Sequence, residues 1–340
     1  AVQWLASPED DHLLFKRYTL ATRGDHPFSI GDYSWGRIKK MNWDPSKDHL
    51  LLEKIASFYQ TGSWYNRQQL QVGKRIINPD LVRSMLNISP HRKIAVVFAH
   101  ILYDATFFYG SSIYSDYKEW LIETVRCAID NPAIHWIIKV HPVNVWRSRM
   151  DNCPLDHLES AILYSEFGEL PDHITLMPAD TQINTYSLFT AIDYGITVRG
   201  TIGMELPCFG VPVVTAGTGR YSGHGFTIDP VDKESYCAVL ASLHNHPPMR
   251  RSQIELARRY AYGALFLRSY PVSSFRFLNN TFCAYVESLR QRTVINPNKV
   301  LSSLYDGDLA GISEFIINGQ TDDLLYNPLA KINHDGEPGQ

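Results

Sequence analysis

The residue types best suited to chemistry gather in one stretch, V-R-G-T-I-G-M-E-L-P-C-F-G-V-P-V-V-T-A-G at 198–217. Its pattern predicts the end of a strand, a turn containing Gly200 and Gly203, a short helix and a buried strand. Thr201 is placed to cap that helix, and Glu205 falls in its first turn. A helix N-terminus beside the carboxyl end of a parallel strand is a typical binding site for phosphate. A carboxylate one helical turn further along could bind the two hydroxyl groups of a ribose. The stretch therefore indicates nucleotide-sugar chemistry.

A second motif, K-V-H-P, comprises residues 139–142 and ends a run typical of a buried strand. It places Lys139, His141 and Pro142 at the edge of an α/β sheet where ligands bind. A histidine there can donate to a phosphate or a carboxylate, and the proline fixes the turn that presents it. The alternative is a histidine and proline that only pack at a strand end.

The segment D-T-Q-I-N-T-Y-S-L-F at 180–189 predicts polar residues just before a helix, with Ser187 in its first turn. These side chains could line the same edge of the sheet, although helix capping alone would also explain them.

The loop T-G-R-Y-S-G-H-G at 218–225 is rich in glycine and carries Arg220 and Tyr221. Together with Arg199, it could clamp an anionic group through backbone amides and guanidinium groups. No G-K-[ST] follows, so its spacing is not that of a P-loop. An ordinary surface loop is the alternative.

Candidate catalytic groups follow the first strand of the predicted sheet, in A-H-I-L-Y-D-A-T-F-F-Y-G at 99–110. His100 and Asp104 are polar residues among aromatic and apolar neighbours. Burial there would shift their pKa values, which suits a general base. The alternative for Asp104 is a buried carboxylate whose partners are backbone amides.

From residue 93 onward, patterns typical of strands alternate with patterns typical of helices, and these elements must position the candidate residues. The alternation predicts βαβ units and a parallel sheet. Strands are expected at 93–100, 135–140, 173–178, 195–198 and 211–216, and helices at 116–130, 187–194, 232–245 and 250–267. Residues 1–88 lack this rhythm and suggest helices at 48–60 and 79–86, and the final segment suggests one at 308–318.

The predicted fold class is α/β, with a Rossmann-type parallel sheet in a nucleotide-sugar-binding domain at 89–270. A smaller lobe at 1–88, mainly helical or incomplete, precedes it, and C-terminal helices and a tail at 271–340 follow.

Composition excludes several function classes. The chain has 340 residues, of which 44% are hydrophobic and 20% charged, as in an ordinary globular protein. A net charge of −3 gives no electrostatic case for binding nucleic acid or an anionic membrane. The five cysteines are scattered, without C-x-x-C, which favours a reducing compartment and argues against a structural zinc. No apolar run predicts a membrane span and no signal peptide is visible, so a cytoplasmic location is expected.

Taken in order, K-V-H-P, the polar S-L-F helix, R-G-T-I-G-M-E-L-P-C-F-G-V-P-V-V-T-A-G and R-Y-S-G resemble the bacterial capsule polysaccharide biosynthesis proteins. Those are GT-B glycosyltransferases related to the β-Kdo transferases, and the resemblance covers roughly residues 93–270. It implies that His141 and Pro142 contact the cytidine phosphate of a donor, and that Thr201 and Glu205 hold phosphate and ribose. The first 88 residues are too short for the second full lobe of that fold.

These observations predict a glycosyltransferase that moves a sugar, with Kdo from CMP-Kdo as one candidate, onto a capsule or other surface glycan or glycolipid. Asp104 and His100 are the expected catalytic groups, no metal or cofactor is required, and a peripheral position at the inner face of the plasma membrane is consistent with the acceptor. The alternatives are a nucleotide-sugar epimerase of the same fold and a non-catalytic glycan-assembly subunit. The expected donor-binding residues are Lys139, His141, Pro142, Ser187, Arg199, Gly200, Thr201, Gly203, Glu205, Arg220 and Tyr221.

Overall fold

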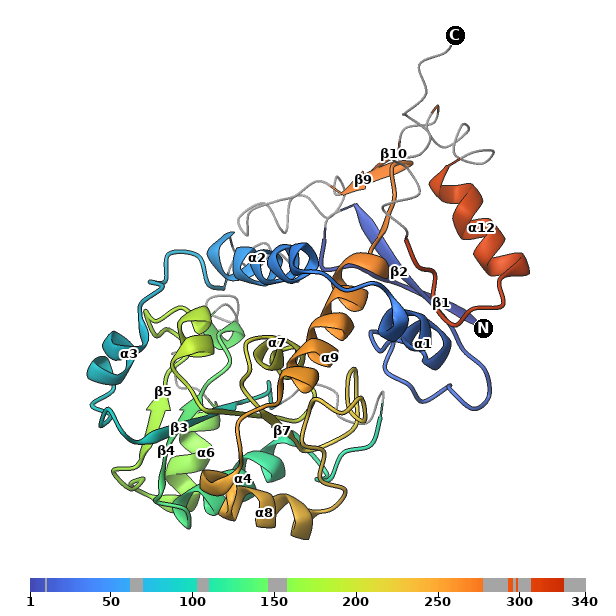
Figure 1. Cartoon of the computed structure of the whole chain (residues 1–340). Helices are drawn as coiled ribbons and strands as arrows, with labels where there is room; N and C mark the ends of the chain where they lie inside the picture. Colours follow the sequence, from blue (N-terminus) through green and yellow to red (C-terminus); the bar gives the residue numbers. More distant parts are fainter. Residues whose placement is uncertain are drawn as a thin grey trace.

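A five-stranded parallel sheet lies in the lower part of the molecule as drawn in Figure 1, surrounded by helices. The computed structural model describes residues 1–9, 11–61, 70–102, 110–145, 158–277, 293–295, 298 and 307–326. The strands are β3 (Lys93–Phe98), β4 (Ile134–Lys139), β5 (Ile174–Met177), β6 (Tyr194–Thr197) and β7 (Val213–Thr215). Their order is β5-β4-β3-β6-β7, which is third, second, first, fourth and fifth along the chain. This is the Rossmann order, and it reverses between β3 and β6, where ligands bind in such sheets. The α/β prediction is confirmed.

Both faces of the sheet are buried, so its strands are apolar at nearly every position. In β3, Ile94 and Val96 enter one core, whereas Ala95 and Val97 enter the other. The helices that pack into the first core are α1 (Asp32–Lys40), α2 (Pro45–Thr61), α3 (Pro79–Met85), α7 (Ile202–Cys208) and α9 (Arg251–Tyr262). Those that pack into the second are α4 (Tyr117–Ile129), α6 (Leu158–Phe167) and α8 (Lys233–Ala241).

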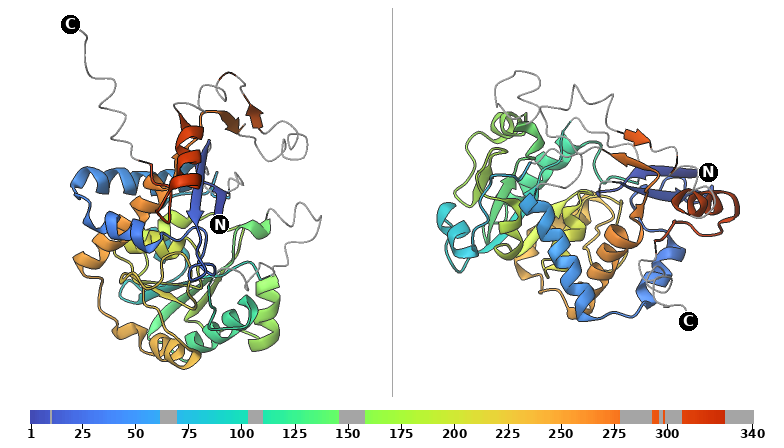
Figure 2. Two further views of the ribbon diagram at one scale, coloured as in Figure 1. Left: turned by 90° about the vertical axis from the view of Figure 1, so that its right-hand side faces the viewer. Right: turned by 90° about the horizontal axis from the view of Figure 1, so that it is seen from above.

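A second, smaller sheet joins the N-terminal residues of the chain to a short strand at residues 270–271. The strands β1 (Val2–Ala6), β2 (His12–Arg17) and β8 (Tyr270–Pro271) pair antiparallel in that order. Helix α12 (Asp308–Asn318) lies beside this sheet, and Phe315 shares a core with Phe15 (Figure 2). The predicted helices in residues 1–88 are present as α2 and α3, but β1 and β2 escape the sequence patterns. The apolar run of β2 is too short to distinguish a strand from a helix. Its second partner, β8, lies far along the chain at Tyr270–Pro271, so no local pattern indicates the pairing.

The sheet β1-β2-β8, helix α12 and residues 319–326 form what is called here the terminal unit, and buried charges tie it together. Nη2 of Arg268 lies 3.0 Å from Oδ1 of Asp323, and both side chains are almost fully buried. Oδ2 of the same aspartate accepts from the amide of Gly31 at 2.8 Å. Asp322 accepts from the amide and hydroxyl of Ser34. These two aspartates cap α1, because its N-cap residue, Gly31, has no side chain to do so.

One predicted helix has a different form. Residues 187–194 were expected to be helical, but the structure has a 3₁₀ helix, η1 (Thr185–Thr190), followed directly by β6. Asn184 begins η1 by accepting from the amide of Tyr186 at 2.9 Å. The remaining elements are η2 (Leu243–Asn245), a π-helical turn η3 (Gly263–Leu267), and an antiparallel pair of β9 (Phe275–Phe277) with β10 (Thr293–Ile295).

Candidate functional site

The predicted residues that follow β3, β4, β6 and β7 meet at one end of the parallel sheet, called here the carboxyl edge. His100 follows β3, His141 follows β4, and Arg199 and Arg220 follow β6 and β7. Burial, followed by electrostatic effects of His141, Arg199 and Arg220, lowers the pKa of His100 to about 3, so this ring is neutral near pH 7. The guanidinium groups of Arg199 and Arg220 give the carboxyl edge positive charge, which favours anionic ligands.

His100 spans the point where the strand order reverses. Its Nε2 lies 3.0 Å from Oγ1 of Thr197 and accepts from the amide of Val198 at 3.1 Å. The ring also stacks on Tyr117 at 4.4 Å. Because Nε2 acts as an acceptor, the proton of the neutral ring is assigned to Nδ1. These contacts join β3 to the turn after β6, while the catalytic role of His100 stays a prediction.

The hydrogen-bonding atoms of the His141 ring differ from those of His100. Its Nδ1 accepts from the amide of Val143 at 3.1 Å, which leaves Nε2 to carry the proton. Nε2 makes no hydrogen bond with any residue that the structure describes. Burial and the charge of Lys139 lower the pKa of His141 to about 3, so the ring stays neutral. His141 consequently offers one neutral N–H at the carboxyl edge.

Lys139, the last residue of β4, is a buried cation. The residue is 4% exposed, and its ammonium has no hydrogen bond or ion pair with the described part of the chain. Burial, followed by the charge of Lys74, lowers the pKa of Lys139 to about 7. Lys74 donates to the carbonyl of Ala179 at 3.0 Å. An ammonium on a residue this deeply buried, without a partner among the described residues, is costly, and an anionic ligand would offset that cost.

Glu205 supplies the acidic group of the site. It is 1% exposed, its Oε2 accepts from the hydroxyl of Tyr59, and its Oε1 has no partner among the described residues. Burial raises the pKa of Glu205 to about 7, against the smaller opposing effects of Tyr59, Thr201 and Arg220. One carboxylate oxygen is thus left to accept a hydrogen bond.

The glycine turn after β6 is filled by protein. A Cβ on Gly203 would lie 2.0 Å from Oη of Tyr221, and that hydroxyl donates to the carbonyl of Gly200 at 2.6 Å. The group that approaches Gly203 closely is therefore Tyr221, which is fully buried. Thr201 does occupy the N-cap of α7, but the predicted side-chain cap is wrong. Its backbone is helical (φ −57°, ψ −26°) rather than extended, and its side chain makes no capping hydrogen bond.

The other predicted residues have mixed surroundings. Ser187 accepts from the amide of Ile77 at 3.0 Å, so it anchors the N-terminal segment to η1. Arg199 donates to the hydroxyl of Ser112. The guanidinium of Arg220 lies 4.8 Å from the centre of the Phe28 ring.

Pro142 directly follows His141 in the turn after β4. Asp104 lies outside the described residues. Donor binding by these residues remains a prediction.

Three neighbours of the site come from residues that sequence reasoning left unassigned. Tyr59 donates a hydrogen bond to Glu205. In addition to burial, the charge of Lys74 lowers the pKa of Lys139, and the charges of Arg220 and Arg199 lower the pKa of His26. Burial and these charges lower the pKa of His26 to about 3. No local pattern marks these three residues, because their partners lie far away in the sequence.

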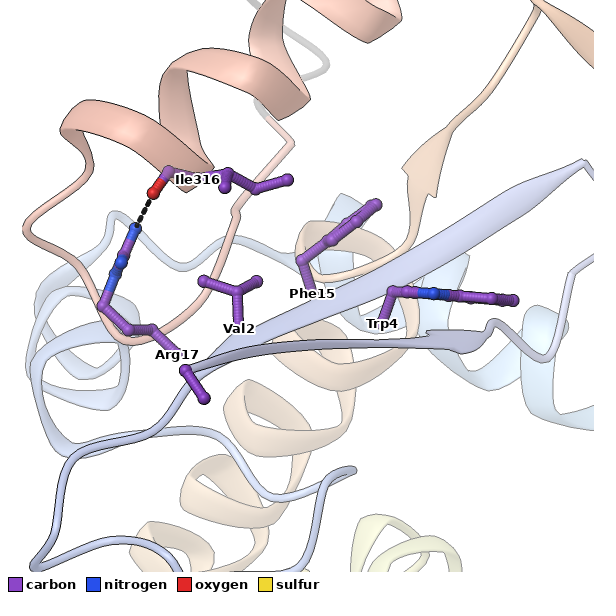
Figure 3. A pocket seen from close by; sticks show the side chains of 6 residues that line it. Val2, Trp4, Phe15, Arg17 and Ile316 are labelled. Atoms are coloured by element: carbon purple, nitrogen blue, oxygen red, sulfur yellow. Dashed lines mark hydrogen bonds between the residues drawn. The ribbon is translucent and has the colours of Figure 1, made fainter.

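A cavity of about 340 Å³ lies in the terminal unit, away from the carboxyl edge (Figure 3). None of the predicted site residues lines it. Arg17, which borders it, donates to the carbonyls of Phe315 and Ile316 at the end of α12. The lining residues are Ala1, Val2, Trp4, Phe15, Arg17 and Ile316.

None of the helices within the described residues combines the length and apolar character needed to cross a membrane. Nor do the described residues contain a group of three or more histidine, cysteine, aspartate or glutamate side chains arranged to hold a metal ion.

Comparison with known proteins gives similarity to solved structures alone: no protein-family model and no curated protein matches the chain. It is similar to KpsC of Thermosulfurimonas dismutans, described as a β-Kdo 2,7 transferase, with 16% identity and a TM-score of 0.42. That alignment covers 78% of this chain and 68% of KpsC.

Epimerase structures are also among the similar ones. UDP-GlcNAc 2-epimerase of Neisseria meningitidis, solved with UDP-GlcNAc, is 14% identical with a TM-score of 0.37, over 71% of this chain and 52% of that one. A further similar structure is that of S. aureus MnaA with UDP, which is 14% identical with a TM-score of 0.35, over 54% of this chain and 45% of that one. Likeness at this level assigns neither a family nor an activity to the chain.

Proposed function

We propose that this protein is a nucleotide-sugar-dependent glycosyltransferase of the GT-B type, which passes a sugar to a glycan or glycolipid acceptor. One observation carries the proposal: Lys139 and Nε2 of His141 are N–H donors without described partners, and both end the same strand at the carboxyl edge. Donors left open at this edge of a Rossmann-ordered sheet suit the phosphates of a nucleotide.

In this proposal each group has a distinct task. Lys139 and the N–H of His141 bind the phosphate and stabilise the charge that develops on it as the sugar leaves. Glu205 accepts a hydrogen bond from a ribose hydroxyl through Oε1. Asp104 deprotonates the acceptor hydroxyl, or acts as the nucleophile if the configuration of the sugar is retained. An Asp104→Asn enzyme with full turnover would remove that last role.

The substrate proposal is finer still. The motif resemblance supports CMP-Kdo as the first donor to test and a capsule or other surface polysaccharide as the acceptor. An activated sugar and a surface glycan under assembly would meet at the inner face of the plasma membrane, where we place the enzyme as a peripheral protein. Conversion of a nucleotide sugar with no acceptor present would instead indicate an epimerase.

Isothermal titration calorimetry with CMP, CDP, UDP and GDP tests the donor site. We expect saturable binding of one nucleotide by the wild type and its loss in His141→Ala. His49→Ala is the matched control, because His49 lies on the exposed surface of α2 and pairs with Glu53 in the same helix. If none of the four nucleotides binds the wild type, or if both variants bind equally well, the proposed donor site is wrong.

A further inference from the structure

A contact between the N-terminal segment and the sheet domain joins Tyr59, near the end of α2, to Glu205 in α7. The tyrosine hydroxyl donates to Oε2 of the glutamate. Oε1 is sealed from solvent and has no donor within hydrogen-bonding distance among the described residues, although the Thr201 side chain is near enough to lower the pKa of the carboxyl group. Buried carboxylate oxygens are nearly always paired, so an open one indicates a missing partner. A hydroxyl group of a ligand would satisfy it.

Tyr59 is itself held in place. Its ring packs edge-on against Phe189 at 5.2 Å and lies 6.0 Å from the ring of Tyr186. Its backbone carbonyl accepts from the side-chain amide of Asn184 at 2.9 Å. The hydroxyl therefore reaches Glu205 from a fixed ring and can fix the orientation of the carboxylate.

We propose that Tyr59 is a positioning residue: it holds Oε2 of Glu205 and so reserves Oε1 as the acceptor for a ribose hydroxyl of the nucleotide. This inference rests on the proposed function and deepens it, because it makes α2 part of the donor site. Residues 1–88 then contribute to recognition of the donor, although they form no second nucleotide-binding lobe.

The charge state of Glu205 gives this role a measurable signature. The groups that act on it are Tyr59 from α2, Thr201 at the N-cap of α7, Arg220 and Tyr221 from the loop after β7, and Cys208 from α7 itself. Burial raises the pKa values of Tyr221 and Cys208, so both are neutral near pH 7, and Arg220 is the charged member of this set. The Tyr59 hydroxyl lowers the pKa of Glu205, and its removal must therefore raise that pKa further.

The test compares Tyr59→Phe with Tyr186→Phe. Tyr186 belongs to the same aromatic cluster, but its hydroxyl has no hydrogen bond with the described residues. Infrared difference spectra, assigned by the band lost in Glu205→Gln, follow the titration of Glu205 without any ligand. Calorimetry with CMP, CDP, UDP and GDP follows binding.

In Tyr59→Phe we expect the titration midpoint of Glu205 to rise by about one pH unit. Nucleotide affinity at pH 7 should fall about fivefold, because the ionised fraction of Glu205 falls by that factor, and recover at pH 9, where the carboxylate is charged again. Tyr186→Phe should change neither quantity. In a Glu205→Gln background, Tyr59→Phe should cause no further loss of affinity.

The two possible failures are distinct. A wild type that binds none of the four nucleotides overturns the proposed function, and the inference with it. A wild type that binds a nucleotide, while Tyr59→Phe and Tyr186→Phe behave alike in titration and affinity, overturns the inference alone. A loss of affinity in Tyr59→Phe that persists at pH 9 also contradicts it, because a merely structural defect would not depend on the charge of Glu205.

Discussion

The terminal unit and the carboxyl edge of the sheet treat buried charge in opposite ways. In the terminal unit, Arg268 pairs with Asp323 and also donates to the carbonyls of Pro27 and Phe28. At the carboxyl edge, Lys139 is almost as deeply buried but has no partner among the described residues. A buried charge without a partner is strongly destabilising, and partners reduce that cost. The first arrangement therefore holds the fold together, and the second reserves a place for a ligand.

The largest effect should follow from breaking the paired charge. Asp323→Asn leaves Arg268 buried without an anion, which should lower the free energy of unfolding by about 3–5 kcal/mol. Urea denaturation measures it. Nucleotide binding by the folded variant should match the wild type, because Asp323 lies in the terminal unit. A loss below about 1 kcal/mol would mean that this ion pair does not stabilise the fold.

His100 and His141 lie at the ends of neighbouring strands, and we expect their removal to affect stability and binding differently. Replacing His100 by alanine leaves the amide of Val198 without its acceptor and opens a cavity beside Tyr117. We expect a loss of about 2–3 kcal/mol. His141→Ala removes one turn hydrogen bond, so it should cost about 0.5–1 kcal/mol while abolishing nucleotide binding. Thermal unfolding and calorimetry of both variants separate the roles, and equal losses of stability would contradict the distinction.

For these two histidines, the sequence predicts their positions at strand ends but not their hydrogen bonds. The apolar runs of β3 and β4 predict a parallel sheet, and both strand ends are visible as polar residues after those runs. His100 and His141 look equivalent in that pattern. Only the hydrogen bonds distinguish them, because one ring contacts the turn after β6 and the other ring does not.

Contacts between distant segments were not predictable for a related reason. Tyr59 reaches Glu205, and Arg268 reaches Asp323, through packing of elements that no local period connects. The pairing of β2 with β8 belongs to the same class. Periodicity reports the face that an element buries, and it carries no information about which remote residue is buried against that face.

The pH dependence of stability provides another test of Lys139. The pKa of this lysine is about 7 in the folded protein, against 10.5 for the unperturbed side chain. Between those values the unfolded chain binds more protons, so stability rises with pH in this window. Lys139→Met removes the ammonium group and should therefore be more stable than the wild type at low pH. This difference in the free energy of unfolding should shrink by ~2–3 kcal/mol between pH 6 and pH 9.5. Denaturation at both pH values checks this, and an unchanged difference would mean that the ammonium is not destabilised by burial.

The smallest effect is expected for an exposed pair. Arg126 lies 3.1 Å from Glu123 and 2.8 Å from Glu166 on the surface of α4 and α6. Glu123→Gln should change the free energy of unfolding by less than about 0.5 kcal/mol, since solvent screens such pairs. Urea denaturation at low and high salt measures it, and a loss comparable to that of Asp323→Asn would show that burial is not the deciding variable.

Arg268, a buried cation with partners, is expected to stabilise the fold, whereas Lys139, which has none among the described residues, is expected to serve a ligand. Denaturation of ligand-free Arg268→Met and Lys139→Met at pH 6 distinguishes these roles. We expect Arg268→Met to be less stable than the wild type by about 3–5 kcal/mol, and Lys139→Met to be more stable by roughly 2–4 kcal/mol. A Lys139→Met variant that is destabilised like Arg268→Met would contradict this expectation, because Lys139 would then be stabilising the fold.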